Sequence, residues 1–354
     1  MSDEVRRQVV AAIRERGPIT FADYMAIALD GPGGYYERPP VGAAGDFVTS
    51  PHVHPVFGEL LGRGIRDLWE ALDRPAPFRV VEVGAGDGTL ARLLMGTLTD
   101  LPVAYTAVET SSGAREALRG IDGVEVRSTI DEADLVLAHE LLDNLPFRVQ
   151  RGANEVRVGL LDGELAEVEV PIDAGSHAWF EGGDGGDGGD GDDDDTILPV
   201  GAVDMLDAIA AAIPRGAALV IDYGDVGSPG GPRHGYRGHR VVADLLADPG
   251  GSDITAGVDF GLLARLAVAH GLEPHGPITQ HDALIALGLE GWIHGELRRQ
   301  HELLDARAGL EAVRTWSGRS RATLLADPAG LGRLRWLLLA RPGMRPPTWL
   351  SARA

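Results

Sequence analysis

The strongest constraint on the fold is an alternation of buried strands and helices along the chain. Residues 79–84 form a β-branched apolar run typical of a buried strand, a glycine-rich turn follows, and leucines at helical spacing continue to residue 98. Further strands are predicted at 104–109, 124–127, 135–140, 218–223 and 334–339, and further helices at 57–72, 203–213 and 259–270. This order predicts an α/β fold with a doubly wound parallel sheet that carries helices on both faces.

Two segments interrupt the alternation. Residues 148–172 alternate charged and apolar side chains around Asp162 and Gly163, which indicates a β-hairpin. Residues 181–195 then contain eight acidic residues, seven glycines and nothing else. A run of this composition cannot bury apolar surface, so we expect a solvated, disordered loop. Residues 282–326 are rich in arginine and glutamate and are expected to be helical.

The composition excludes several kinds of chemistry. The chain has no cysteine and no lysine, so its 32 basic residues are all arginine. Thiolate nucleophiles and cysteine-bound metals are excluded, as are Schiff bases, pyridoxal-phosphate attachment and the lysine of a phosphate-binding loop. The net charge is −21 and no basic run occurs, so we expect neither nucleic acid nor membrane as a partner. No apolar stretch approaches the roughly 20 residues that span a bilayer, and we expect a cytoplasmic protein.

The glycine turn after the first strand is a candidate cofactor site. Glu82 precedes Gly84, Gly86 and Gly88, and a second acid, Glu109, ends the next predicted strand, where it would face a ribose. A dinucleotide site requires Gly-x-Gly-x-x-Gly, but here the third glycine comes one residue early. A carboxylate at position 82 would repel a pyrophosphate and suit a cationic ligand such as S-adenosylmethionine. The pattern therefore favours a methyl donor, with a purely structural turn as the alternative.

Further motifs extend along the whole chain. The most specific are Gly-Asp-Phe-Val-Thr-Ser-Pro at 45–51 and Asp-Ile-Thr-Ala-Gly-Val-Asp-Phe at 253–260. The others lie at 17–25, 34–36, 57–61, 81–90, 140–146, 222–224 and 236–240. In this order they resemble the MidA family of S-adenosylmethionine-dependent methyltransferases. The resemblance implies a Rossmann-like class I methyltransferase with a seven-strand doubly wound sheet, and an activity on protein arginine.

The resemblance also implies a domain division and a set of cofactor residues. We expect an N-terminal helical cap at 1–74 and a methyltransferase domain at 75–346. Within that domain, the hairpin and acidic loop would form an insertion at 148–199, and the helical segment another at 282–326. The donor would be held by Glu82, Gly84, Gly86, Gly88 and Glu109, with a loop containing Gly45, Thr49, Ser50 and Pro51 closed over it.

Acidic residues after the fourth predicted strand are the catalytic candidates. A guanidinium, with a pKa above about 12, needs a carboxylate to orient it and to take a proton. Glu140 and Asp143 stand where ligands bind in open sheets. Capping of the next turn is an open alternative for Asp143. Asp222 and Tyr223, at the end of the fifth strand, are expected either to shape the acceptor pocket or to form a satisfied strand end.

Two histidines depart from the family pattern and leave other acceptors open. His52 replaces a common glutamate and His139 a common asparagine. A histidine near the donor suits deprotonation of a hydroxyl or carboxyl group, which points to a small-molecule O- or N-methyltransferase as the alternative. A catalytically silent assembly factor that binds the donor is the third hypothesis. His52 and His54 lack a third ligand, so no metal site is predicted, and a homodimer remains open.

Overall fold

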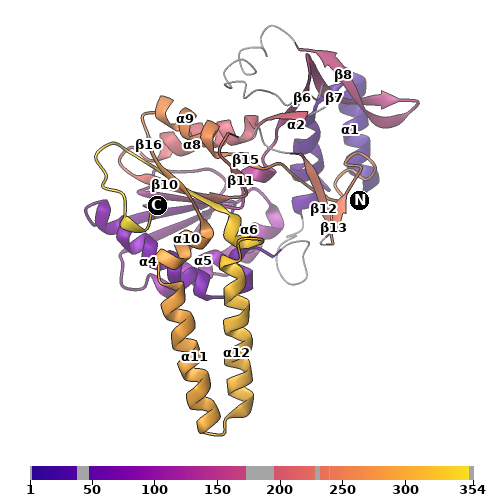
Figure 1. The fold of residues 1–354 in the computed structure, drawn as a ribbon. Coiled ribbons are helices and arrows are strands. Elements are labelled where there is room, and N and C mark those ends of the chain that lie inside the picture. The colour runs from indigo at the N-terminus through magenta and orange to yellow at the C-terminus, as the bar shows by residue number, and fades with distance from the viewer. Residues whose placement is uncertain (1, 38–47, 173–194, 228–231, 239, 351–354) are drawn as a thin grey trace.

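The computed structural model describes residues 2–37, 48–172, 195–227, 232–238 and 240–350, and a seven-stranded sheet lies at its centre (Figure 1). The strand order is β16-β17-β10-β5-β2-β3-β4. The strands are β2 (Phe78–Val83), β3 (Val103–Val108), β4 (Val124–Arg127), β5 (Leu135–His139), β10 (Ala217–Asp222), β16 (Glu273–Thr279) and β17 (Arg335–Ala340). The strands from β10 to β4 run parallel, whereas β17 is antiparallel to both neighbours. The predicted doubly wound α/β sheet is confirmed.

Helices cover both faces of this sheet, as Figure 1 shows. One face packs against α4 (Val56–Ala71), α5 (Thr89–Thr97), α6 (Ser112–Arg119) and α10 (Gln280–Ala286), and the other against α8 (Val200–Ala212) and α9 (Phe260–Ala269). The helix ends follow the local sequence. Asp259 caps α9 by accepting hydrogen bonds from the backbone N–H groups of Gly261 and Leu262 at 2.9 and 3.0 Å.

A second lobe is formed by residues 2–37 and strands β6–β9, around its own apolar core. It contains α1 (Ser2–Arg16), β1 (Ile19–Thr20), α2 (Phe21–Met25), β6 (Arg148–Arg151), β7 (Asn154–Leu161), β8 (Glu164–Pro171) and β9 (Asp195–Leu198). A π-helical turn, Ala26–Asp30, and a 3-10 turn, Tyr35–Glu37, follow α2. The β7–β8 hairpin turns at Asp162 and Gly163, which both have positive φ, as their sequence predicts. Of the acidic run, only Asp195 lies within the described residues.

This arrangement differs from the expected helical cap over residues 1–74. Strand β1 pairs with β7, more than a hundred residues later, so the first helices share a core with the insertion. By contrast, α4 packs on the central sheet through apolar residues such as Phe57, Leu61 and Ile65. The segment is therefore divided between the two lobes, because each helix buries its apolar face where a matching surface is available.

The remaining elements are short strands and a long helical hairpin. The strands are β11 (Gly224–Asp225), β12 (His234–Arg237), β13 (Arg240–Val242), β14 (Asp253–Thr255) and β15 (Val258–Asp259), and the 3-10 turns are Leu142–Asn144, Leu324–Ala326, Leu331–Arg333 and Thr348–Leu350. Helices α11 (Leu289–Asp305) and α12 (Gly309–Thr323) project away from the sheet, within the segment expected to be helical (Figure 1). Among the described residues, no helix combines the length and apolarity needed to cross a membrane.

Candidate active site

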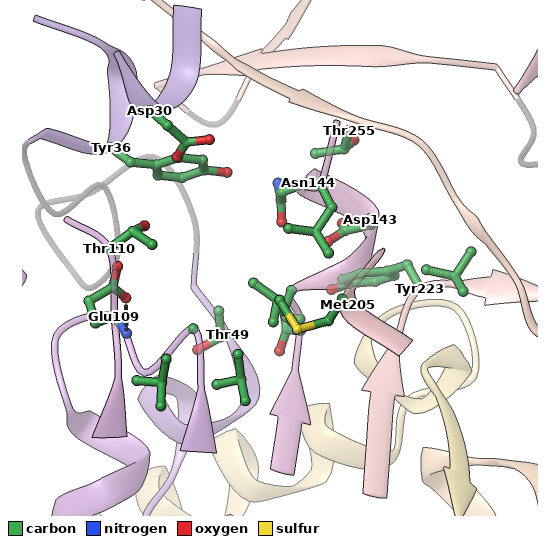
Figure 2. Close-up of a pocket in the computed structure, with 18 of the residues that line it drawn as sticks. Asp30, Tyr36, Thr49, Glu109, Thr110, Asp143, Asn144, Met205, Tyr223 and Thr255 are labelled. Carbon is green, nitrogen blue, oxygen red and sulfur yellow. Dashed lines mark hydrogen bonds between the residues drawn. The ribbon is translucent and has the colours of Figure 1, made fainter. Parts of the chain in front are cut away.

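A cavity of about 1790 Å³ lies at the carboxyl ends of the central parallel strands. Figure 2 shows Glu109, Thr110 and Thr49 on one side of it and Asp143, Asn144 and Tyr223 on the other. Asp30 and Tyr36, from the second lobe, complete the wall. Pockets for a single small molecule usually measure about 300–1,000 Å³, so this cavity has room for two reactants side by side.

The glycine turn lines the cavity on the same side as Glu109. Gly84 and Gly86 line the cavity, and both have positive φ. A Cβ built on Gly86 would meet no atom within 4 Å, so a side chain there would project into open space that a ligand can use. Gly88 does not line the cavity. A Cβ at Gly88 would lie 2.5 Å from Ile121 and 2.8 Å from Leu118, so this glycine permits close packing of the turn against α6 and the chain after it.

The Glu109 carboxylate connects the glycine turn to the start of α6 through two hydrogen bonds. Its Oε2 accepts a hydrogen bond from the Gly86 N–H at 2.9 Å, and its Oε1 accepts one from the Ser111 N–H at 2.8 Å. A carboxylate has about four acceptor positions, so capacity remains for hydroxyl donors from a ligand in the cavity. This geometry fits the expected contact with ribose hydroxyls.

Glu82 lies behind the turn rather than on the cavity wall. It is 3% exposed, and its Oε2 accepts a hydrogen bond from the Tyr105 hydroxyl at 2.7 Å. Burial raises the pKa of Glu82 to about 8, although the Tyr105 hydrogen bond opposes the shift. A protonated carboxyl group that does not face the cavity cannot select a cationic ligand by direct contact. Glu109, and not Glu82, is therefore the acid of this pair that lines the cavity.

The segment that begins at Thr49 connects the two sides of the cavity. Thr49 lines the cavity, and the short helix α3 (Ser50–Val53) starts immediately after it. The Ser50 N–H donates to Glu140 Oε1 at 3.2 Å. His52 Nδ1 lies 2.8 Å from Thr49 Oγ1, and its Nε2 lies 3.0 Å from Asp87 Oδ2 in the glycine turn. Ser50 and Pro51 are buried behind the wall. Gly45 lies outside the described residues.

The Asp87 carboxylate holds the segment that begins at Thr49 through its contact with His52. Burial alone would raise its pKa, but hydrogen bonds from His52 and Thr89 outweigh burial and hold the pKa of Asp87 below its ordinary value. An ionised Asp87 therefore accepts from His52 on one side and from the N–H and hydroxyl of Thr89 on the other. The departure from the family pattern at position 52 thus gives a specific contact between α3 and the glycine turn.

Buried acids gather on the opposite side. Glu140 follows β5 with a φ of 49°, a left-handed conformation that non-glycine residues adopt at an energetic cost. Burial raises the pKa of Glu140 to about 8, and Asp222 adds to the rise. Asp143 and Asp253 line the same part of the cavity. Burial and the neighbouring acids Asp222, Asp253 and Glu140 raise the pKa of Asp143 well above its usual range.

His139 lies behind the cavity wall, with its Nε2 3.2 Å from Oε1 of the wall residue Glu140. It packs against the Phe57 ring at a centroid distance of 5.3 Å, and it does not belong to the cavity wall. Burial lowers the pKa of His139 to about 3, with a further contribution from His52. A general base works best when its pKa is near the working pH. The role considered for His139 as a base near neutral pH is not supported by this position.

Three wall residues were not singled out from the sequence. The Tyr36 hydroxyl donates to Asp253 Oδ1 at 2.5 Å, and Asn144 Nδ2 donates to Asp253 Oδ2 at 2.8 Å. All three lie in motifs that carry the family resemblance, which was the available signal. His54 packs on Trp292 and accepts from the Val56 N–H, away from His52. Within the described residues, no group of three potential ligands is placed to hold a metal ion.

Comparison with known proteins identifies the family. A family model for S-adenosyl-L-methionine-dependent methyltransferases matches residues 60–278. Mitochondrial protein arginine methyltransferase NDUFAF7 from Homo sapiens is 30% identical over 329 residues, covering 80% of this chain and 73% of the relative. The homolog from Drosophila melanogaster is 29% identical over 389 residues, covering 96% and 85%.

The solved structures agree with the sequence comparison. A superfamily member from Burkholderia thailandensis bound to S-adenosyl-homocysteine matches with a TM-score of 0.84 at 26% identity, covering 100% of this chain and 95% of that one. A native crystal structure from the same organism gives a TM-score of 0.79. The relatives are named as mitochondrial proteins, which contradicts the prediction of a cytoplasmic location. The chain belongs to the MidA family of S-adenosylmethionine-dependent methyltransferases.

Proposed function

We propose that this methyltransferase acts on arginine in a protein substrate, and that the two sides of the cavity hold donor and acceptor. The observation that carries the proposal is the group of buried acids opposite the glycine turn, Glu140, Asp143 and Asp253. Buried acids of this kind favour a cationic partner, because a nearby positive charge offsets the cost of ionising them in a low dielectric.

For the donor, we propose a site between Gly84, Gly86, Glu109 and Thr49. Gly86 leaves open space next to its main chain, and Glu109 offers acceptor positions for hydroxyl groups. In this role Glu82 supports the turn from behind and does not touch the donor. S-adenosylmethionine, when bound, supplies a methyl group activated by its positive sulfur.

For the acceptor, we propose that Glu140 and Asp143 orient a guanidinium group. Its planar fork of N–H donors matches a carboxylate in two parallel hydrogen bonds, which a lysine ammonium cannot reproduce. The rings of Tyr36 and Tyr223 line the same cavity and suit a delocalised cation. In-line methyl transfer requires above all that the acceptor nitrogen is aligned with the methyl group of the donor. Two carboxylates that follow a strand of the central sheet can hold the guanidinium in that position.

Two further considerations favour protein arginine over the alternatives. The curated relatives that match most of the chain are named protein arginine methyltransferases. The small-molecule alternative was motivated by His139 and His52. Neither lines the cavity: His139 is buried, and His52 Nε2 lies 3.0 Å from Asp87 Oδ2.

A labelling experiment tests the proposal. The full chain is incubated with isotope-labelled S-adenosylmethionine and proteins of a cell lysate, and acid hydrolysates are analysed by mass spectrometry. We expect label in methylarginine, lost in Glu140→Gln and retained in Glu116→Gln, a control at an exposed position of α6. Label confined to small metabolites, or to lysine or carboxyl groups, would contradict the proposal.

A further inference from the structure

Among the described residues that line the cavity, two are arginines, Arg333 and Arg335. Arg333 ends a 3-10 turn, and Arg335 is the first residue of β17. The pairing of β17 with β10 places Arg335 opposite Asp222, at the end of the strand that leads into Tyr223. Positive charge therefore borders the side of the cavity where the acceptor is proposed to bind.

The two arginines differ in how their charge is compensated. Arg335 Nη2 donates to Asp225 Oδ1 at 2.9 Å, so this guanidinium already has a carboxylate partner. Arg333 is exposed, and it has neither an ion pair nor a side-chain hydrogen bond with any residue that the structure describes. A guanidinium has five N–H donors, so those of Arg333 are available to a ligand in the cavity.

The ring of Tyr223 holds the Arg333 guanidinium in place. The central carbon of that guanidinium lies over the ring, 5.7 Å from its centroid, and a cation is attracted to an aromatic face at this distance. On the cavity wall Tyr223 lies beside Asp143, as Figure 2 shows. The wall thus presents a negative group, an aromatic ring and a positive group next to one another.

A carboxylate is the ligand that best fits Arg333. The planar fork of a guanidinium matches a carboxylate in two parallel hydrogen bonds, and such charge-assisted bonds are stronger than neutral ones. The alternative is that Arg333 only balances the charge of the cavity acids. Against this, Arg333 forms no ion pair with any described acid, and water screens an exposed charge from groups that it does not contact.

We propose that Arg333 recognises an acidic residue of the substrate, so that the substrate class is a protein segment with Asp or Glu within two positions of the target arginine. This inference rests on arginine as the acceptor. The target guanidinium lies against Glu140 and Asp143, and the neighbouring carboxylate accepts hydrogen bonds from Arg333 beyond the Tyr223 ring. Two residues of an extended segment span about 7 Å, enough to pass a single aromatic ring. A basic residue at the same position is repelled, so the contact selects among arginines.

Mapping of the methylated sites tests the inference. The full chain is incubated with isotope-labelled S-adenosylmethionine and proteins of a cell lysate, and the labelled peptides are sequenced by mass spectrometry. We expect the wild type to label arginines with an acid within two positions, and Arg333→Gln to lose at least fivefold of the label at these sites. The control is Arg314→Gln, at an exposed position of α12 far from the cavity, which should label like the wild type.

An exchange of charges separates recognition from a structural role. The lysate protein that carries a mapped site is prepared with its acid retained, replaced by glutamine or replaced by lysine. The wild type should have the highest kcat/KM with the acid retained, at least fivefold above the glutamine form and mainly through KM, and the lowest with lysine. Arg333→Glu should reverse this order and favour the lysine form, whereas a structural role would lower the rate with all three forms alike.

The possible outcomes distinguish this inference from the proposed function. Labelled sites without a neighbouring acid, or a wild-type preference that persists in Arg333→Gln, would overturn the inference and leave arginine methylation intact. An equal loss with all three substrate forms would overturn it as well, since Arg333 would then only balance charge in the cavity. The absence of any label in methylarginine would refute the proposed function itself.

Discussion

Replacing Glu109 with alanine gives the most direct test of the donor side. The carboxylate already fixes the Gly86 and Ser111 N–H groups, so its remaining acceptor positions are held in place for ribose hydroxyls. A hydrogen bond to a charged group is worth about 1.5–3 kcal/mol. The affinity for S-adenosylhomocysteine should therefore fall roughly 10- to 150-fold in Glu109→Ala. Glu109→Gln keeps one acceptor oxygen and should lose less.

The assay is isothermal titration calorimetry with S-adenosylhomocysteine, accompanied by thermal unfolding of each variant without ligand. Unfolding data are needed because the alanine leaves two N–H groups without an acceptor, which costs about 1 kcal/mol each. Glu116→Ala, on the exposed face of α6 where Glu116 pairs with Arg119, should bind like the wild type. A dissociation constant within twofold of the wild type in folded Glu109→Ala would refute the proposed ribose contact.

Three further predictions concern the opposite wall and α3. Glu140→Gln should reduce turnover at least tenfold with donor affinity nearly unchanged, which separate binding and rate measurements would show. His52→Gln should weaken donor binding several-fold, because α3 loses its bond to ionised Asp87; equal affinity would mean that the contact is unimportant. The pKa of Glu140 is about 8 in the folded protein and near 4.5 in the unfolded chain. Between these two pH values the folded protein therefore binds more protons than the unfolded chain. Stability of the unliganded protein should fall as pH rises from about 5 to about 8, and thermal unfolding of Glu140→Gln should show less of this loss.

The central sheet could be predicted because its strands are buried on both faces. The runs that form β2, β3, β5 and β10 are mostly apolar, and their bounds differ from the sequence prediction by a residue or so. Strand β16 was missed, since its sequence contains two prolines and a glycine that are typical of loops. It is an edge strand with a bulge, where the lack of N–H donors is tolerated.

The site could be located from the sequence, but the direction of each side chain could not. In β2, Glu82 points away from Val81 and Val83, and the register places Tyr105 diagonally opposite on the same face. Only the pairing between strands makes that contact visible. The same is true of His139, which turns toward Phe57 while the next residue faces the cavity.

The β7–β8 hairpin of the second lobe could be predicted, but the way this lobe is assembled could not, for a related reason. The pairing of β1 with β7 and the bond from Tyr36 to Asp253 join positions far apart in the chain. The local sequence indicates that a segment can form a strand, but it does not indicate which distant segment pairs with it.

The bond from Tyr36 to Asp253 also bears on attempts to trim the protein. Tyr36 belongs to the segment after the first helices, whereas Asp253 lies in β14 and accepts a hydrogen bond from Asn144, next to the proposed acceptor site. A fragment reduced to the central sheet and its covering helices would retain the glycine turn but would lose the part of the cavity wall that the second lobe supplies. Such a minimal enzyme would leave Asp253 without its phenol donor and would expose the acids of the cavity wall further to solvent.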